Sequence, residues 1–477
     1  DVVGLPGAIV REARERVRSA IKNCGFPFPA NRITVNLAPA NTRKESAVYD
    51  LPIALSILQK HGNLPPLPPD AAFIGELSLY GELRSAAGVL PMAMAAPTLG
   101  IKKLFCPAEN ANEASLASDI EVYPLNSLQE LLDHLSGYNV ISPVPEWKPD
   151  ENTHKGLDYA DVMGQESAKR ALEIAAAGGH NILLIGPPGS GKSMLASRLP
   201  SILPAMTKRE SLETTKIYSV SGLTSKTNPM IWERPFRAPH HTVSSTGLSG
   251  GGRIPHPGEI SLAHNGVLFL DEFPEFTSES LEILRQPMEN GSVTVTRVSG
   301  TVTYPSRFML VCAMNPCRCG WYGHPSGKCN CSEKSVAQYQ SKISGPLADR
   351  IDLHIEVPSV KYDDLSRRKK AESSESIRRR VNEAREIQTR RFEGHEDISC
   401  NAYIPPSLMA EMCPLRQDAE EFMRRAFVKM GLTARSHDRI LRVSRTIADI
   451  AGSKNIEVAH IAEAVQYRSL DRRISMF

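Results

Sequence analysis

The chain has 477 residues, a formal net charge of +3, 41% hydrophobic residues and 23% charged residues, which is the balance of an ordinary globular protein with about two to four domains. No uninterrupted apolar run approaches the roughly 18 residues that cross a bilayer, and no secretory signal is visible. These features argue against a membrane protein and lead us to expect a cytoplasmic one, while the charge balance identifies no partner.

The first 145 residues predict a mixed α and β domain. The stretch ITVNLAP has the pattern of a strand, YDLPIALSILQKHG that of a helix ending at glycine, and AFIGELSLYGEL that of a hairpin. The sequence begins inside an expected strand and helix, so we expect further residues before Asp1. The stretch VISPVPEWKPDENTHKG, residues 140–156, is rich in proline and charge and predicts a linker, which we place at residues 146–157.

An apolar strand, a glycine-rich turn and a helix start follow one another in NILLIGPPGSGKSMLASRL, which places the G-x-x-x-x-G-K-[ST] motif in its expected context. The glycines let backbone N–H groups approach a phosphate, Lys192 adds a positive charge, and Ser193 offers an oxygen ligand to Mg²⁺. We therefore predict a nucleoside triphosphate site made by Gly186, Pro187, Pro188, Gly189, Ser190, Gly191, Lys192 and Ser193.

Polar residues flank three later strands. In NGVLFLDEFPEF, Asp271 is predicted to hold Mg²⁺ and Glu272 to polarise the attacking water, although isolated acid pairs at strand ends usually only begin solvated loops. Asn315 ends RFMLVCAMN, where it either orients that water or is an ordinary strand-end residue. Arg350 begins a strand in GPLADRIDLHIEV and is either an arginine finger for a neighbouring subunit's phosphate or part of a surface salt bridge.

The order of elements divides the rest of the chain. Strands alternate with helices over residues 158–360, which predicts a parallel sheet, and residues 373–477 are helical in pattern. DVMGQESAKRALEIAAAGG predicts an amphipathic helix, and SIRRRVNEAREIQTRRF and ARSHDRILRVSRTIADIAG predict the clearest C-terminal helices. NGSVTVTRVSGTVTYPS predicts a hairpin with its turn at Ser-Gly.

Four of the nine cysteines lie within fifteen positions, in two C-x-C pairs separated by GWYGHPSGK. Four thiolates suit a closed, tetrahedral Zn²⁺ site, and we expect such a site in an insert of about residues 315–332. Disulfides are disfavoured in a cytosolic protein, while reactive thiols or no role at all are the alternatives. The predicted ligands are Cys317, Cys319, Cys329 and Cys331, with His324 as a substitute for one of them.

Taken together, these motifs resemble the AAA+ ATPases, and more narrowly the magnesium-chelatase-like YifB/ComM family. The most specific stretches are DVVGLPGAIVREARERVRSAI, RPFRAPHHTVSSTGLSGGGRIPHPGEISLAHNGVLFLDEFPEF, AMNPCRCG and TARSHDRILRVSRTIAD. The resemblance implies ATP and Mg²⁺ as cofactors and a homo-hexameric ring with ATP at the subunit boundaries. It also implies a multidomain α/β fold with an AAA+ P-loop core on a parallel sheet and a helical C-terminal lid.

The same resemblance implies roles for single residues. Asn315 would be the sensor, Arg350 the finger, and Arg435 in the lid a second sensor, with Arg439 and Arg442 as alternatives. The predicted hairpin would point into the central pore. There Arg297 is either a DNA contact or a hairpin-surface residue without a partner, and the nearby His240 and His241 are expected to be structural.

The N-terminal region, residues 1–145, resembles the Lon protease domain, through NTRKESAVYDLPIAL and GELSLYGELRSAAGVLPMAMAAPTLGIKKLFCP. In this register Val48 stands at the nucleophile position, and Leu90 or Met92 at the position of the catalytic lysine. None of these side chains is a nucleophile or base, and the pattern does not assign those roles to the nearby Lys44 and Ser46. We therefore expect an α+β, Lon-protease-like domain without protease activity.

Two functions of different classes remain. The resemblance implies an ATP-driven DNA motor, a helicase that migrates branches in homologous recombination during natural transformation. It would act on single-stranded and branched DNA alongside recombination proteins. The alternative is a protein-remodelling or magnesium-chelatase-like ATPase whose N-terminal domain docks a partner. An active ATP-dependent protease is a weaker third interpretation, against which Val48 argues.

Overall fold

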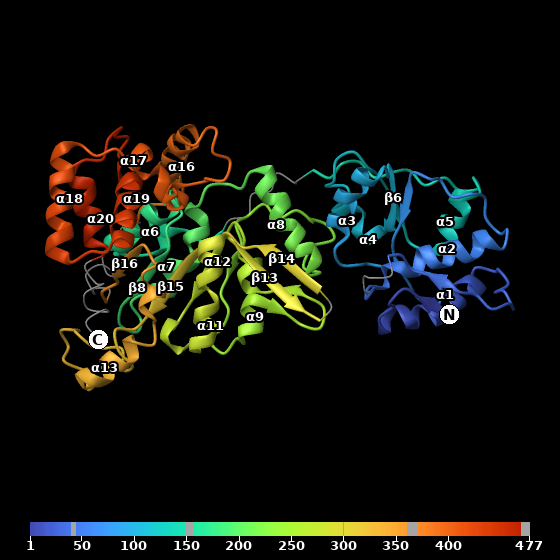
Figure 1. Cartoon of the computed structure of the whole chain (residues 1–477), viewed down its shortest axis with the longest axis horizontal. Helices are drawn as coiled ribbons and strands as arrows, with labels where there is room; N and C mark the ends of the chain where they lie inside the picture. Colours follow the sequence, from blue (N-terminus) through green and yellow to red (C-terminus); the bar gives the residue numbers. More distant parts are fainter. Residues whose placement is uncertain (40–43, 149–155, 299, 360–370, 469–477) are drawn as a thin grey trace.

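A computed structural model describes residues 1–39, 44–148, 156–298, 300–359 and 371–468. The molecule is elongated, with the N-terminal region at one end, a helical region at the other and the largest sheet near the helical region (Figure 1). Part of the predicted linker, 149–155, lies outside the described residues. None of the helices in the described part of the chain has the length and apolarity of a bilayer-crossing segment.

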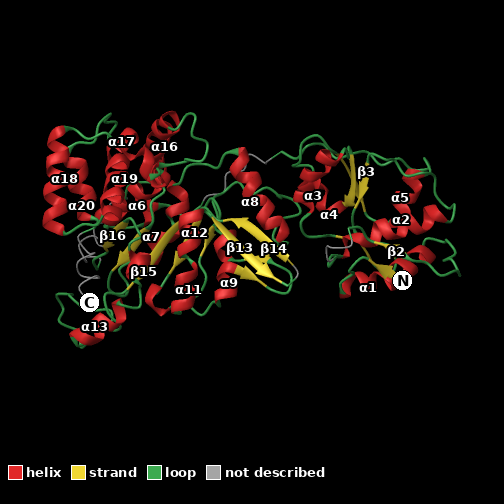
Figure 2. Ribbon diagram, viewed as in Figure 1, coloured by secondary structure: helices red, strands yellow, loops and turns green. Residues whose placement is uncertain are grey.

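The N-terminal region combines small sheets with helices (Figure 2). Its largest sheet is parallel, with the order β3-β6-β7. The expected hairpin is confirmed only in its second half, because β4 pairs with β5 whereas β3 leaves to pair with β6. The elements are β1 (Val2–Val3), α1 (Ala8–Asn23), β2 (Val35–Asn36), α2 (Asp50–Lys60), β3 (Ala71–Phe73), β4 (Glu76–Leu77), β5 (Leu83–Arg84), α3 (Val89–Ala95), β6 (Lys103–Pro107), α4 (Ala108–Ala114), β7 (Glu121–Leu125) and α5 (Leu128–Leu135).

The central sheet has five strands in the order β16-β8-β15-β12-β9, all parallel. Side chains alternate between two cores: Val311 belongs to the core shared with the helical region, and its neighbour Cys312 to the core on the opposite face. Both faces are therefore covered, as expected of a parallel sheet. The strands are β8 (Ile182–Ile185), β9 (Phe236–Arg237), β12 (Val267–Leu270), β15 (Met309–Met314) and β16 (Leu353–Glu356).

Short elements and the predicted hairpin cover one side of this sheet. The hairpin is confirmed: β13 and β14 pair antiparallel from Ser292↔Pro305 to Arg297↔Gly300. Val293 and Val295 are buried in the core beneath it, which fixes its base. These elements are α8 (Lys208–Val220), α9 (Ser245–Ser249), β10 (Gly250–Gly251), β11 (His256–Pro257), α10 (Glu259–Leu262), α11 (Ser278–Ile283), α12 (Arg285–Asn290), β13 (Ser292–Arg297), β14 (Gly300–Pro305), α13 (Glu333–Gln340) and α14 (Gly345–Ala348). Helix α7 (Lys192–Ser197) lies on the other face, where Leu195 and Ala196 join the core shared with the helical region.

The helical region packs against the sheet through α6 (Glu166–Gly178). The sequence predicts an amphipathic helix here, but ten of its 13 residues are buried, because the sheet covers one side of it and helices α16 and α19 contact it from another. Gln388 also donates from Nε2 to the Ala177 carbonyl at 3.0 Å. The region comprises α16 (Ser374–Arg391), α17 (Met409–Met412), α18 (Gln417–Met430), α19 (Ala434–Ile450) and α20 (Val458–Gln466).

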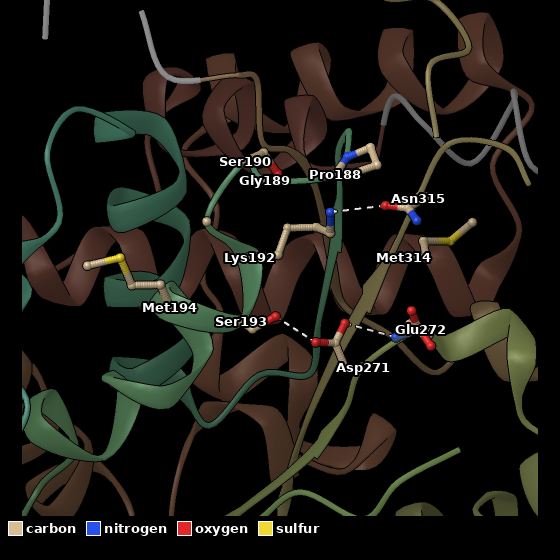
Figure 3. Close-up of a pocket in the computed structure, with 11 residues that line it drawn as sticks. Pro188, Gly189, Ser190, Lys192, Ser193, Met194, Asp271, Glu272, Met314 and Asn315 are labelled. Atoms are coloured by element: carbon tan, nitrogen blue, oxygen red, sulfur yellow. Dashed lines mark hydrogen bonds between the residues drawn. The ribbon is translucent and has the colours of Figure 1, made fainter. Parts of the chain in front are cut away.

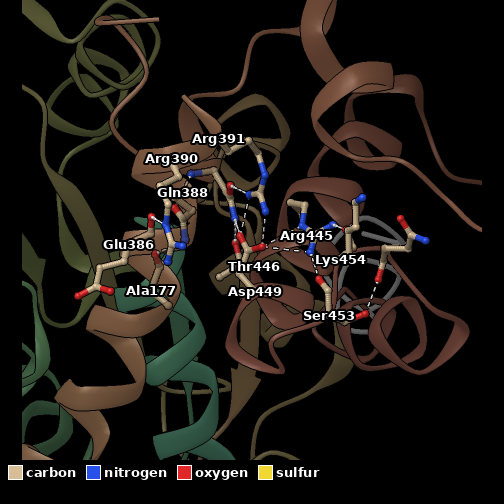
Figure 4. Close-up of polar contacts among 12 residues, drawn as sticks. Ala177, Glu386, Gln388, Arg390, Arg391, Arg445, Thr446, Asp449, Ser453 and Lys454 are labelled. Atoms are coloured by element: carbon tan, nitrogen blue, oxygen red, sulfur yellow. Dashed lines mark hydrogen bonds and ion pairs between the residues drawn. The ribbon is translucent and has the colours of Figure 1, made fainter. Parts of the chain in front are cut away.

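A buried carboxylate joins the helices of this region (Figure 4). The side chain of Asp449 is fully buried and accepts hydrogen bonds from Arg391 Nη1 at 2.8 Å, Arg445 Nε at 3.1 Å and Asn401 Nδ2 at 2.8 Å. Arg445 also donates to the carbonyls of Ser453 and Lys454. A buried charge requires such partners, so the network holds α16, α19 and the loop after α19 in one arrangement.

Candidate functional site

The glycine-rich loop joins β8 to α7 and lines a cavity of about 360 Å³. Gly189 and Gly191 have φ values of +74° and +89°, a region that favours glycine. A Cβ atom at either position would meet no atom within 4 Å, so their backbone faces open space. Figure 3 shows the cavity, whose lining residues are Pro188, Gly189, Ser190, Gly191, Lys192, Ser193, Met194, Asp271, Glu272, Met314 and Asn315.

Lys192 brings a nearly buried ammonium group to this cavity. Its Nζ donates to the carbonyls of Gly186 and Pro187 at 2.8 and 3.0 Å and to Asn315 Oδ1 at 3.2 Å. Burial lowers the pKa of Lys192, since the charged form loses hydration there. All three acceptors are neutral, so a phosphate oxygen is a better partner for this cation than any of them.

Ser193 and Asp271 present oxygen atoms side by side. Ser193 Oγ donates to Asp271 Oδ2 at 2.5 Å (Figure 3), although the two residues come from a helix start and a strand end. Mg²⁺ prefers oxygen ligands in octahedral geometry, in which adjacent ligands lie about 2.9 Å apart. The donor set therefore fits Mg²⁺, which these two side chains would hold directly or through water.

Glu272 follows with an unusual backbone. Its φ is +51°, a region that is strained for a non-glycine residue, and its N–H donates to Asp271 Oδ1 at 2.9 Å. The carboxylate of Glu272 is 3.1 Å from His241 Nδ1. The turn at Glu272 thus separates the two acidic side chains, with Asp271 toward Ser193 and Glu272 toward His241.

Sequence reasoning missed the contact of His241. Strand β9 pairs parallel with β12, so the residues after β9 emerge at the same edge of the sheet as Asp271 and Glu272. A polar residue shortly after a predicted strand could have signalled this, but β9 has only two residues and lies in the proline-containing stretch RPFRAP. His240, by contrast, pairs with Thr242 Oγ1 at 2.9 Å.

The predicted arginines lie away from the cavity of their own chain. Arg350 precedes β16 at the opposite edge of the sheet, where it pairs with Glu289 and donates to the Pro346 carbonyl. Arg435 is exposed at the start of α19. Arg439 Nε is 3.6 Å from Asp352, and Arg442 donates to the Ile404 carbonyl. Among the described residues, none from the helical region lines the cavity, so the predicted lid does not cover it.

The four cysteines predicted to bind metal are brought together. Their Sγ atoms all lie within 4.8 Å of one another, and all four are free of disulfides. Cys329 Sγ is 3.8 Å from that of Cys317 and 3.7 Å from that of Cys319, close to the edge of about 3.8 Å expected for a tetrahedral Zn–S₄ centre. His324 instead pairs with Ser326 and Ser359, so it is not a substitute ligand here.

The thiols of this cluster shift one another's pKa. Hydrogen bonding from the Trp321 backbone, and then from Cys317, lowers the pKa of Cys319 to about 6. The pKa of Cys329 is raised to about 11, because the lowering by a backbone hydrogen bond from Cys331 is outweighed by burial and by the Cys319 and Cys317 thiols. Metal binding requires thiolates, and several thiolates at these distances repel one another unless a cation lies between them. The cluster is thus suited chemically to a divalent metal ion.

The residues at the expected protease positions have local structural roles. Val48 and Leu90 are buried, and Leu90 packs in a small apolar cluster with Leu116 and Met230. Lys44 is buried and donates to the Pro39 carbonyl, and Ser46 accepts from the Val48 N–H at 3.3 Å as the cap of a short helical turn. These bonds account for Lys44 and Ser46 without a catalytic role.

The tip of the β13–β14 hairpin carries Arg297 and Val298. Arg297 Nη1 donates to the Thr296 carbonyl at 2.9 Å, and the side chain of Val298 is fully exposed. Ser299, in the turn, lies outside the described residues. A cationic side chain and an exposed apolar one therefore stand together at the tip of the β13–β14 hairpin (Figure 2).

Comparisons with known proteins cover nearly the whole chain. The family profile of the magnesium chelatase subunit ChlI matches residues 158–365, that of subunit ChlI of Mg-chelatase residues 1–110, and that of the ChlI C-terminal part residues 371–468. Over 483 residues the chain is 43% identical to the competence protein ComM of Haemophilus influenzae, covering 99% of this chain and 92% of that protein.

Two further relatives match very different shares of the chain. YifB of Escherichia coli is 42% identical over 476 residues, covering 99% of this chain and 92% of that protein. The 67 kDa subunit of magnesium chelatase from Chlorobaculum parvum is 28% identical over 166 residues, covering 34% of this chain and 23% of that subunit. The glycine-rich loop, the acidic pair after β12 and Asn315 after β15 meet at the carboxyl ends of the parallel strands. The chain belongs to the magnesium-chelatase-like ComM/YifB family of AAA+ ATPases.

Proposed function

We propose that this protein is an ATP-driven DNA motor that unwinds DNA and migrates branches during recombination in natural transformation. The observation that carries the ATPase part is the meeting of Lys192, Ser193, Asp271, Glu272 and Asn315 around one cavity. The DNA part is supported by the exposed, partly cationic hairpin tip and by the likeness to a competence protein over almost the full length of both chains.

Each residue of the cavity has a task in hydrolysis. Lys192 would exchange its carbonyl partners for β- and γ-phosphate oxygens. Ser193 and Asp271 would hold Mg²⁺, which when bound supplies positive charge against the charge that develops on the phosphates. Glu272 accepts a proton from the attacking water as general base. Asn315, already hydrogen-bonded to Lys192, orients that water beside the terminal phosphate.

The arginines support assembly into a ring. Arg350 lies at the edge of the sheet opposite the cavity and pairs with a half-exposed glutamate, Glu289, while its Nε has no hydrogen-bond partner among the described residues. In the proposed homo-hexamer it leaves Glu289 for the ATP of the neighbouring subunit. Arg435, exposed on α19, is likewise placed to act on a neighbour rather than on its own cavity.

We propose that DNA is held by the hairpins in the pore of this ring. Arg297 supplies a phosphate contact, and Val298 supplies an apolar surface beside it. Single-stranded and branched DNA are the expected substrates, with recombination proteins as partners. The N-terminal region, which resembles the Lon fold without its nucleophile, would serve as a docking module.

A four-way junction with fluorophore and quencher on adjacent arms tests this proposal. Purified protein is mixed with the junction, Mg²⁺ and ATP, and Lys192→Ala serves as the control that cannot use ATP. Arm separation by the wild type and not by Lys192→Ala is the expected result. ATP hydrolysis without any separation of junctions or forks would refute the DNA motor while leaving the ATPase intact.

The second candidate is a protein-remodelling or chelatase-like motor. It is favoured by the matches of magnesium chelatase profiles to all three parts of the chain. Under this proposal the N-terminal region binds a protein partner, and ATPase activity rises with that partner rather than with DNA. Stimulation by junction DNA at low protein concentration would count against it.

We propose that Zn²⁺ occupies the four-cysteine cluster as a structural ion in a cytoplasmic protein. Free thiols at tetrahedral spacing are typical of such sites in a reducing compartment. Metal analysis of the purified protein should find about one zinc per chain. The double variant Cys317→Ser/Cys331→Ser should lose it, and an unchanged zinc content would refute the site.

A further inference from the structure

We propose that the loop closed by the four cysteines, residues 317–331, is a positioning element of the ATP site, so that the metal in the cluster controls the efficiency of ATP hydrolysis. The proposal rests on the proposed ATPase function and zinc site, and it assigns a role in ATP hydrolysis to the loop between the cysteines. Two separate contacts connect the loop to the cavity.

The first connection runs along the chain. Asn315, which lines the cavity and accepts a hydrogen bond from Lys192, is two residues before the buried ligand Cys317. The carbonyl of the intervening Pro316 accepts from Gln340 Nε2 at 3.0 Å. The backbone between sensor and metal ligand is therefore short and held on one side, so a displacement of Cys317 is transmitted to Asn315.

The second connection is a direct contact with the glycine-rich loop. Gly320 has a φ of +86°, and a Cβ atom there would lie 2.5 Å from Pro188 Cδ and 2.7 Å from Cγ. The Gly320 N–H donates to the Cys317 carbonyl at 2.9 Å, which joins this contact to the metal cluster. Pro188 lines the cavity, so the cysteine loop supports the phosphate-binding loop from outside.

The cysteine loop has little else to hold it in place. Between residues 317 and 331 only Cys317 and Gly320 are buried. The remaining contacts given for the described residues are made by exposed or half-buried side chains, such as His324 Nε2 with Ser359 Oγ at 3.1 Å and Lys328 Nζ over the Trp321 ring at 5.0 Å from its centre. A segment with so little apolar burial is ordered mainly by its metal, and a misplacement of about 1 Å near reacting groups costs up to about 10²-fold in rate.

Three glycines of the same loop provide a matched test. Gly320, Gly323 and Gly327 all have positive φ, but a Cβ at Gly323 or Gly327 would meet nothing within 4 Å. Each alanine variant thus carries a similar backbone strain, and only Gly320→Ala presses on Pro188. We expect all three to keep about one zinc per chain, with kcat/KM for ATP reduced at least about tenfold in Gly320→Ala, mainly through KM. The two controls should stay within about twofold of the wild type.

Zinc removal tests the metal's part in the full-length protein. A strong thiol-reactive reagent followed by a chelator should release zinc and lower kcat/KM for ATP in parallel, and reduction with added Zn²⁺ should restore both. Equal ATPase in Gly320→Ala and Gly323→Ala, or full ATPase after zinc loss, would overturn this inference alone. A wild type without zinc would overturn the metal site, and a wild type without ATPase would overturn the proposed function.

Discussion

The pair between His241 and Glu272 predicts that the ATP site is partly restrained at rest. His241 Nδ1 is 3.1 Å from the Glu272 carboxylate, and a carboxylate engaged by an N–H donor is a poorer base toward water. We therefore expect His241→Ala to raise the basal ATPase rate in the absence of DNA. The change removes the donor but leaves the backbone turn at Glu272 unaltered.

The size of the expected rate increase follows from the solvent exposure of the two side chains. The two side chains are 28% and 57% exposed, and pairs of this kind are worth about 0.2–1 kcal/mol. If the paired form is inactive, Glu272 is free in about 16–40% of molecules, and deleting His241 raises the basal rate about two- to sixfold. A larger increase would mean that the pair is stronger than its exposure allows.

The assay compares basal ATPase rates of the wild type, His241→Ala and His240→Ala at saturating ATP. His240 is the matched control, because its ring lies beside that of His241, tilted and 4.1 Å away between centres, while its Nδ1 pairs with Thr242 rather than with Glu272. Only His241→Ala should be faster. A slower His241→Ala enzyme would refute the reasoning, since it would show that the histidine assists the base, and an equal increase in His240→Ala would assign the effect to the loop.

Three further predictions concern separate parts of the molecule. Glu272→Gln should bind ATP normally but hydrolyse it at least about 10²-fold more slowly, and normal turnover would remove Glu272 as the base. Asp449→Ala leaves the guanidinium of Arg445, which is 1% exposed, without its carboxylate. The free energy of unfolding, measured with denaturant, should fall by about 3–5 kcal/mol. It should fall by less than about 1 kcal/mol in the exposed control Asp418→Ala, and equal losses would contradict the argument. Arg297→Ala should weaken DNA binding and leave the ATPase rate without DNA unchanged. The slope of log affinity against log salt concentration should fall in magnitude by about one, and an unaltered slope would exclude the contact.

Much of the fold could be predicted because local patterns of apolar and polar residues indicate its strands and helices. The apolar run ending at Asn315 became the fully buried strand β15, and the alternating β-branched run around Arg297 became a hairpin. The two-residue edge strand β9 was not predicted, since two residues between prolines carry no periodic signal. Helix α6 is amphipathic as predicted, with its charged residues on one face, but the sequence does not reveal that a second layer of helices covers most of it.

The candidate site, too, could be predicted only in part. The glycine-rich loop and the polar strand ends meet as expected, because parallel strands bring their carboxyl ends to one edge. The contact of His241 with Glu272 depends on two loops from different strands, and the contact of Gly320 with Pro188 depends on the absence of a side chain. Neither leaves a local pattern in the sequence, so only three-dimensional distances reveal them.

The packing of the helical region restricts how the proposed motor converts ATP hydrolysis into movement. Residues of α16 and α19 share one continuous apolar core with β8, β12 and β15, and His180 before β8 hydrogen-bonds Thr446 of α19 at 2.8 Å. To swing these helices over the nucleotide would open that core and break the His180–Thr446 hydrogen bond. In the proposed ring the stroke is therefore best carried by whole subunits turning against their neighbours, with sheet and helices advancing together.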